Sequence, residues 1–202
     1  MSRRRPGNPN RPPRGSSIKV EPIRDLEAVG RIKVMLADAP RDYCLFVTGI
    51  NSAYRASELL SITVRHAEAL RPGDRFELKQ AKNSKYRAIT INNNVADAMG
   101  RCLDWHPTGE ADAPLFWSRK SRTALCVPSL TRLVKCWCAE LGLRGNYGSH
   151  TLRKTWGYHQ RKTYDKPLSL LTRAYGHASE AQTLEYLCIQ PEEFDELYAG
   201  EL

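Results

Sequence analysis

Three kinds of side chain suited to phosphate chemistry follow one another near the carboxyl end of the chain. His150 and Arg153 are three residues apart, His177 comes later, and Tyr186 stands nine residues beyond that histidine. On a helix, side chains three apart lie on one face, so His150 and Arg153 can both reach a single small anion such as a phosphate. Taken alone, such a pair more often belongs to a solvated surface or a helix cap.

Two basic residues earlier in the chain are further candidates for anion binding. Arg55 follows an apolar helix and a turn, which predicts that it stands at a rigid helix start. On local grounds an ion pair with Glu58 across one turn is the favoured interpretation of Arg55. Lys82 lies in a polar stretch between two predicted strands, where an exposed lysine usually only protects a sheet edge. Neither residue indicates a function by itself.

The elements that must position these residues are mostly helical, with one small antiparallel hairpin, which is an α+β fold class. Leu26, Val29, Ile32 and Leu36 repeat at helical spacing and predict a helix that Pro22 opens and that ends before Pro40. Alternation of apolar and polar residues predicts two strands joined by a hairpin loop. The strands are expected at 75–79 and 87–91, and further helices at about 40–48, 56–61, 93–105, 128–141, 151–161, 167–175, 179–187 and 191–198.

Length and charge are consistent with one domain that binds a polyanion. The 202 residues are 41% hydrophobic, and 31 Lys and Arg against 22 Asp and Glu give a net charge of +9. Such a charge favours nucleic acid as a partner, although charge alone is weak support. We expect a disordered basic tail over residues 1–19 and a single domain over 20–202. The tail is either an arm along DNA phosphates or a solubilising leader, with nearly equal support for each.

Cysteine and histidine spacing predicts neither a metal site nor a cofactor. The six cysteines lack the C-x-x-C spacing of structural zinc and are interpreted as buried, reduced thiols. His66, His106 and His159 are expected to be ordinary surface or satisfied side chains, and the four tryptophans to be core or groove packing. No apolar run is long enough to span a bilayer, so we expect no membrane partner and a reducing, cytoplasmic compartment.

Taken in order, six residues change this assessment. Arg55, Lys82, His150, Arg153, His177 and Tyr186 together resemble the active-site signature of tyrosine recombinases, the phage integrase family. The choice of Lys82 over Lys79 or Lys85 rests on its distance from Arg87 and the following strand. The matching stretches are Tyr54–Leu60, Ala81–Arg87 with the strand to Ile91, Pro114–Lys120, His150–Thr155 and Tyr175–Ser179, with Thr183 and Tyr186 in the positions the family uses.

The resemblance implies a site-specific recombinase that performs integration, excision or inversion through a 3′-phosphotyrosyl intermediate, without a metal. Arg55 and Arg153 would bind the non-bridging phosphate oxygens, and His177 would add a further hydrogen-bond donor. Tyr186 would be the nucleophile, helped by proton removal at His150. Lys82, on a hairpin, would protonate the 5′ leaving oxygen.

Double-stranded DNA is the partner implied, together with a tetramer of subunits on two DNA sites. The segment 191–198 would dock on a neighbouring subunit or pack on its own core. DNA-bending accessory proteins and association with the nucleoid are further expectations. Two alternatives remain open at this point: a type IB topoisomerase that nicks and reseals one strand, and a DNA-binding regulator that has lost catalysis.

The sequence departs from the family's pattern in two ways. The turn over 49–54 is longer than the short link that the family commonly has before its first arginine. In 202 residues we expect no separate helical core-binding domain of the kind that usually precedes the catalytic domain. The size is similar to that of small recombinases resembling fimbrial invertases, which consist of a catalytic domain alone.

Overall fold

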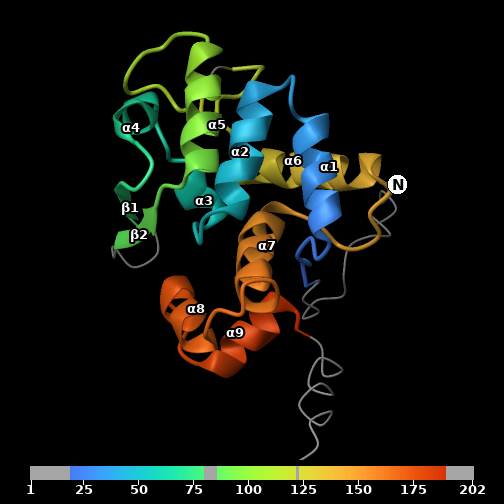
Figure 1. Cartoon of the computed structure of the whole chain (residues 1–202). Helices are drawn as coiled ribbons and strands as arrows, with labels where there is room; N and C mark the ends of the chain where they lie inside the picture. Colours follow the sequence, from blue (N-terminus) through green and yellow to red (C-terminus); the bar gives the residue numbers. More distant parts are fainter. Residues whose placement is uncertain (1–18, 80–85, 122, 190–202) are drawn as a thin grey trace, which may run out of the picture.

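The computed structural model describes residues 19–79, 86–121 and 123–189. Within these ranges the chain forms nine helices and one two-stranded antiparallel sheet at an edge of the molecule (Figure 1). This arrangement confirms the predicted fold class. The basic segment 1–18, the hairpin loop with Lys82 and the predicted helix over 191–198 lie outside the described residues.

The larger part of the core surrounds helix α2 (Pro40–Ile50), which packs against α1 (Leu26–Met35), α5 (Asn93–Asp104) and α7 (Ser149–Lys162). Its residues Leu45, Phe46 and Val47 are completely buried. Phe46 meets Trp137 of α6 (Val127–Glu140) edge to face, with ring centroids 5.9 Å apart. Aromatic and aliphatic burial of this kind is the main stabilising contribution to the domain.

Helix α7 approaches α2 closely because α2 carries a glycine at the crossing. A Cβ placed on Gly49 would lie 2.6 Å from Cδ1 of Leu152, which is closer than side-chain atoms approach one another. Glycine at this position therefore lets the two backbones come together. The result is a fixed position for the middle of α7, where Arg153 follows Leu152.

The sheet consists of β1 (Arg75–Lys79) and β2 (Tyr86–Thr90), which pair from Arg75 opposite Thr90 to Lys79 opposite Tyr86. Short helices α3 (Ala56–Leu59) and α4 (Val64–Ala69) precede it. Phe76 and Leu78 point into the core, as the alternation in the sequence predicts.

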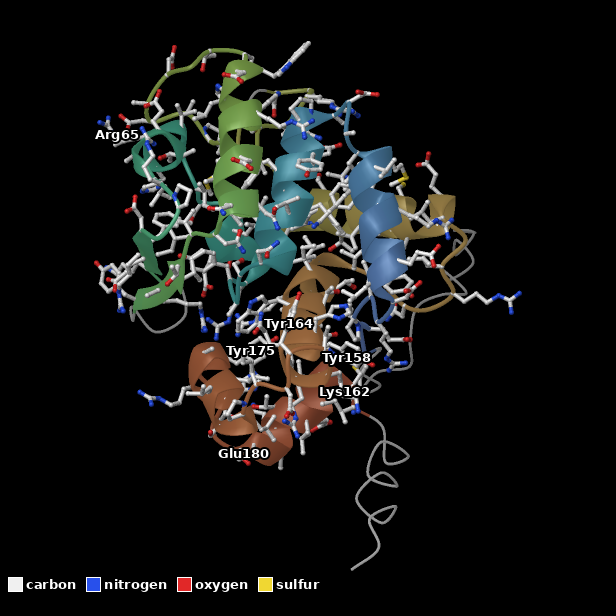
Figure 2. The ribbon with its side chains drawn as sticks, in the orientation of Figure 1. Arg65, Tyr158, Lys162, Tyr164, Tyr175 and Glu180 are labelled. Carbon is white, nitrogen blue, oxygen red and sulfur yellow. The ribbon has the colours of Figure 1, made fainter. Side chains whose placement is uncertain are left out.

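The last two helices, α8 (Leu168–Tyr175) and α9 (Glu180–Leu187), form a smaller layer against α7 (Figure 1). Leu171, Tyr175 and Leu187 make a separate buried cluster there. Figure 2 shows Tyr175 on the side of α8 that faces α7, and its hydroxyl donates to the carbonyl oxygen of Arg153 at 2.8 Å. Helix α8 is thereby attached to the helix that carries the histidine–arginine pair.

Residues 19–25 form neither helix nor strand and run beside α7. The Glu21 amide donates to the Asn146 carbonyl at 2.8 Å, and the Ile23 amide donates to Thr155 Oγ1 of α7 at 2.9 Å. The carboxylate of Asp25 then caps α1 by accepting from the amides of Glu27 and Ala28. The helix therefore starts at Leu26 and not at Pro22, and the side chain of Leu26, predicted to face the core, is 50% exposed.

Three other expectations from the sequence were wrong. Helix α4 was not predicted, because its six residues are too few for a periodic pattern. Cys126 and Cys136 are exposed, although the other cysteines are buried or half-buried and all six are free. Trp105 is 73% exposed where core or groove packing was expected. Across the described residues, none of the helices has both the length and the apolar character needed to cross a bilayer.

Candidate active site

Arg55 stands at the N-cap of α3, where the preceding turn is held at both ends. Asn51 accepts a hydrogen bond from Asn92 at 2.9 Å, and the Tyr54 hydroxyl donates to the Phe76 carbonyl of β1 at 2.8 Å. Both the amide and a guanidinium nitrogen of Arg55 donate to Glu58 at 2.8 Å. The local ion pair predicted from the sequence is therefore present, and the long turn is fixed in place.

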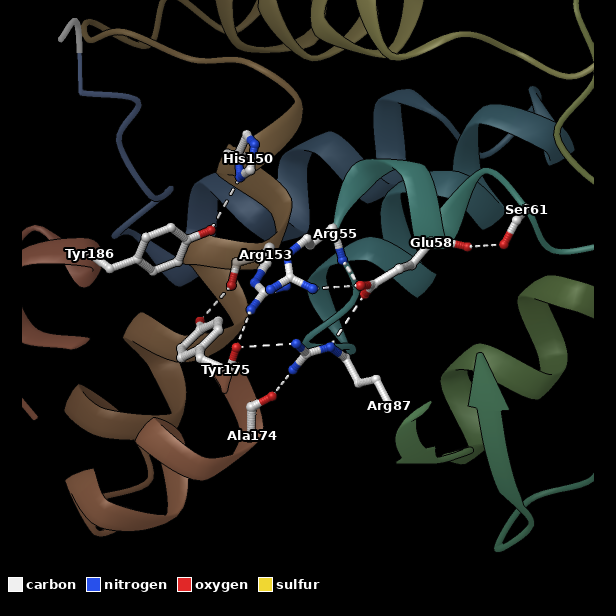
Figure 3. Close-up of polar contacts among 9 residues, drawn as sticks. All are labelled: Arg55, Glu58, Ser61, Arg87, His150, Arg153, Ala174, Tyr175 and Tyr186. Carbon is white, nitrogen blue, oxygen red and sulfur yellow. Dashed lines mark hydrogen bonds and ion pairs between the residues drawn. The ribbon is translucent and has the colours of Figure 1, made fainter. Parts of the chain in front are cut away.

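Glu58 also binds a second arginine, which comes from the sheet. Arg87 of β2 is 5% exposed, and its Nε lies 3.3 Å from the second carboxylate oxygen of Glu58. The same guanidinium donates to the carbonyls of Ala174 and Tyr175 at the end of α8 (Figure 3). One buried carboxylate thus joins α3 to β2, and Arg87 joins both to α8.

Arg153 lies at the centre of the site and is 3% exposed. Its Nη2 donates to the Tyr175 carbonyl at 3.1 Å, and its Cζ lies 4.7 Å from the ring centroid of Tyr175 and 5.9 Å from that of Tyr186. Nε and Nη1 are buried and have no hydrogen-bond partner within the described part of the chain. It is costly to leave the buried donors of a charged group without hydrogen bonds. These two atoms therefore indicate a site that an anion completes.

Tyr186 projects from α9 toward α7. Its hydroxyl lies 3.3 Å from Nδ1 of His150 (Figure 3). Nζ of Lys154, one helical turn further along α7, lies 4.8 Å from the centroid of its ring. Lys154 is 5% exposed and donates to Sγ of Cys188 at 3.2 Å. The phenol is thus held between two basic side chains of one helix.

His177 follows the left-handed Gly176 that ends α8. Its ring stacks on Tyr175, with centroids 5.0 Å apart and planes 13° apart, and lies 5.1 Å from the ring of Tyr186. Nδ1 lies 3.0 Å from Oγ1 of Thr183, which is completely buried on α9. The two tyrosine rings and the threonine fix the plane of the imidazole.

Burial and the gathered positive charges shift the ionisation of the site. Burial lowers the pKa of Arg153 to about 10, which still leaves the guanidinium charged near neutral pH. Desolvation, with Arg153, Arg55 and Arg87 adding to it, lowers the pKa of His177 to about 4. Desolvation and three neighbouring cations likewise lower the pKa of His150, so both histidines are neutral imidazoles at pH 7. Burial raises the pKa of Tyr186, against the opposing effect of Arg153 and Arg55.

The structure therefore brings together five of the six side chains singled out from the sequence, while Lys82 lies outside the described residues. A surface pocket of about 370 Å³ opens at this point and contains His150, His177 and Tyr186 in its wall. In the described part of the chain, no group of three or more His, Cys, Asp or Glu side chains is arranged to hold a metal ion. The positive charge around these side chains is that of Arg55, Arg87, Arg153 and Lys154.

Sequence patterns gave no role to Arg87 or Lys154, although both contact the site. Arg87 had a signal, because it pairs across the sheet with the buried Leu78 and so occupies a core-facing position of its strand. A charged residue at such a position is rarely buried without a partner. No local signal marked Lys154, since it follows Arg153 on a helix whose buried side is decided by tertiary packing.

Comparison with known proteins agrees with this geometry. Residues 29–193 match the model of the phage integrase family. The probable integrase/recombinase YoeC of Bacillus subtilis (strain 168) is 32% identical over 172 residues, which cover 84% of this chain and 90% of that protein.

Solved recombinase structures share the fold. XerA recombinase superposes with a TM-score of 0.71 at 17% identity, over 89% of this chain and 65% of XerA. XerH site-specific recombinase, bound to its palindromic difH substrate, gives 0.69 at 20% identity, over 90% of this chain and 52% of XerH. This chain spans less than two thirds of the length of either protein. From the family match, the 32% identical relative and the shared fold, it follows that the chain belongs to the phage integrase family and has the catalytic-domain fold of tyrosine recombinases.

Proposed function

We propose that this chain is a site-specific recombinase that cuts and rejoins double-stranded DNA through a covalent 3′-phosphotyrosyl intermediate. The observation that carries the proposal is the state of Arg153. Its guanidinium is buried beside the Tyr186 ring with Nε and Nη1 lacking partners among the described residues. A DNA phosphate has the charge and the oxygens that those donors lack.

Arg55 and Arg153 are the proposed ligands of the non-bridging phosphate oxygens. Attack on a phosphodiester adds negative charge to those oxygens, and fixed cations in a partly dry site stabilise that charge more than water does. Glu58 supports this role of Arg55 because its carboxylate orients the guanidinium at 2.8 Å. Because arginine supplies the positive charge, the proposed reaction is metal-independent.

Tyr186 is the proposed nucleophile and His150 its proton acceptor. A phenol whose pKa is raised by burial remains protonated at pH 7, so its proton has to leave as the oxygen attacks phosphorus. His150 Nδ1 lies 3.3 Å from the hydroxyl, and the lowered pKa of this histidine keeps the imidazole neutral and able to accept. The bond between phosphorus and the 5′ oxygen then breaks, and Lys82 is the proposed proton donor to that leaving oxygen.

The covalent bond to tyrosine conserves the energy of the phosphodiester. A 5′-hydroxyl from the same or a second strand can therefore attack the phosphotyrosine and rejoin the DNA without a nucleotide cofactor. Exchange between two DNA sites accounts for integration, excision or inversion, whereas resealing of the same strand restores the starting DNA.

Similar proteins support DNA as the partner and an assembly of several subunits. The structures that share this fold include a lambda integrase dimer bound to a COC′ core site and the Tn1549 transposon integrase with circular intermediate DNA. We propose that this chain acts on duplex DNA as a tetramer on paired sites, with DNA-bending accessory proteins, in the cytoplasm at the nucleoid. The segment 191–198 is a proposed contact between subunits.

A covalent-capture experiment tests the reaction class. Wild-type protein is incubated with nicked duplexes from the neighbourhood of its own gene, and protein–DNA adducts are separated by denaturing electrophoresis. We expect an adduct with the wild type and with Tyr164→Phe, a matched control at a 58% exposed tyrosine, and none with Tyr186→Phe. An adduct that persists in Tyr186→Phe would assign the nucleophile elsewhere. Binding without any adduct would favour a DNA-binding regulator.

A further inference from the structure

Two threonine hydroxyls lie behind the imidazole of His177. Thr183 Oγ1 is 3.0 Å from His177 Nδ1 and 2.9 Å from Thr172 Oγ1 of α8. Thr172 Oγ1 in turn lies 2.9 Å from the Leu168 carbonyl oxygen, to which it donates. A longer contact joins Thr183 Oγ1 to the Ser179 carbonyl at 3.3 Å. The three shorter contacts form one continuous chain that leads from the ring to the backbone of α8.

Each hydroxyl has only one hydrogen, and this limits the direction of the chain. A carbonyl oxygen only accepts, so the hydrogen of Thr172 belongs to Leu168. The Thr183 hydrogen then goes to Thr172 at 2.9 Å or to the more distant Ser179 carbonyl at 3.3 Å. In either case Thr183 has only lone pairs left for His177, whose Nδ1 must therefore carry a hydrogen. If Thr172 donated to Thr183 instead, and Thr183 to His177, a lone pair of Thr172 would face the Leu168 carbonyl oxygen at 2.9 Å.

We infer that Thr183 and Thr172 hold the proton of neutral His177 on Nδ1, so that Nε2 donates to an anion only after His177 has gained a second proton from water. This inference rests on the proposed function and deepens it, since the anion is the DNA phosphate. The two threonines are positioning residues, because they act through the imidazole.

The charges around His177 make such proton uptake depend on the phosphate. Desolvation, together with the positive charges of Arg153, Arg55 and Arg87, lowers its pKa to about 4 in the free protein. A phosphate bound to the arginines offsets their charge, and this raises the pKa. An imidazolium suits the existing chain, because Nδ1–H still donates to Thr183. The pocket that His177 shares with Tyr186 also contains four other titratable side chains, namely Lys19, His150, Lys154 and Glu185.

Proton uptake by His177 makes the binding of phosphate depend on pH. Between the pKa of the free protein and the higher pKa of the complex, binding takes up a proton, so affinity for the phosphate falls as the pH rises through that interval. Above the interval, neutral His177 presents an unprotonated Nε2 and adds no donor.

Nuclear magnetic resonance of nitrogen-15-labelled histidine tests the tautomer without reference to activity. The full chain contains five histidines, and the spectrum of His177→Gln identifies the His177 signals. At pH 7 we expect Nδ1 of His177 to be protonated and Nε2 to be bare. Thr172→Val removes the nearer acceptor of the Thr183 hydrogen and should shift the proton toward Nε2, whereas Thr172→Ser should keep the wild-type tautomer. Unchanged signals of the other histidines verify folding.

A neutral His177 with its proton on Nε2 in the wild type would overturn the inference.

A second experiment titrates His177 with and without a nicked duplex. We expect the midpoint to rise by about one pH unit or more, which is a tenfold or larger change in proton affinity. An unchanged midpoint in a bound complex would overturn the proton uptake. Failure to form a covalent adduct contradicts the proposed function alone, because the tautomer is measured in the free protein.

Discussion

At the scale of single residues, the environment of Arg153 indicates that this side chain binds an anion. It is 3% exposed, and among the described residues no carboxylate pairs with it. The Tyr175 carbonyl and the faces of two tyrosine rings partly compensate the loss of water. Since desolvating an unpaired charge is costly, the protein retains this arrangement at some expense of stability.

Replacing Arg153 with lysine is predicted to affect the chemical step more than the binding of DNA. Lysine keeps the charge but lacks the planar fork that donates to two oxygens at once. We expect adduct formation under single-turnover conditions to fall by about 10²-fold to 10³-fold. Arg161→Lys, on the same helix, is the matched control, because the Arg161 side chain is 38% exposed and pairs with an exposed Asp165. An equal loss in both variants would contradict a specific role for Arg153.

At the scale of elements, the site depends on how closely α8 approaches α7. Gly157 of α7 leaves room for the Tyr175 hydroxyl, and a Cβ there would overlap that hydroxyl and lie 2.7 Å from Cδ2 of Leu187. Tyr175 also stacks on His177 and accepts from Arg153 through its carbonyl. Its position therefore decides where two of the site residues lie.

Gly157→Ala is expected to displace Tyr175 and lower the free energy of unfolding by about 1–3 kcal/mol, the usual cost of overpacking. Gly100→Ala is the control, because Gly100 is an exposed helical glycine of α5 with no atom within 4 Å of the added Cβ. Alanine should stabilise that helix by about 0.5–1 kcal/mol. Urea unfolding measures both effects. A neutral result for Gly157→Ala would mean that α8 moves away from α7 at little cost.

At the scale of the whole molecule, the segment 19–25 links α7 to α9. His159 of α7, 7% exposed, donates from Nε2 to the Ile23 carbonyl at 2.9 Å, so its Nδ1 accepts from the Thr163 hydroxyl at 2.8 Å. Arg24 donates to the Cys188 carbonyl at the end of α9. The segment thereby fixes α7 relative to the helix of Tyr186, and desolvation of His159 favours its neutral imidazole, which supplies both hydrogen bonds.

A pH dependence of stability follows from this arrangement. Desolvation lowers the pKa of His159, so the unfolded chain binds a proton more tightly than the folded one. The stabilisation is present above the unfolded pKa of about 6.5 and is lost as the pH falls below it, by up to about 1.4 kcal/mol per pH unit for this group. Between pH 7.5 and pH 5 the free energy of unfolding, measured with denaturant, should fall less steeply with falling pH in His159→Gln than in the wild type. Identical slopes would exclude His159 as a contributor.

Much of the fold and most of the site residues could be predicted from the sequence because their signals are local or ordered. Periodic apolar residues and capping signals located eight of the nine described helices to within a few residues, and alternation located both strands. Arg55, His150, Arg153, His177 and Tyr186 were found because their order along the chain resembles a known signature. The paired Glu58 was also foreseen, since three residues separate it from Arg55 on one helix face.

Only the tertiary structure decided how these residues meet. Arg87 reaches Ala174 and Tyr175, 87 and 88 residues away, and no local pattern specifies such a contact. Lys154 under the Tyr186 ring and the threonine chain behind His177 depend on the packing of α7, α8 and α9. The sequence by itself determined which side chains are candidates for the chemistry, since residue type and order are written in it. Long-range packing and burial set their distances, their ionisation and the direction of their hydrogen bonds, because these arise only when distant segments come together in a low-dielectric interior.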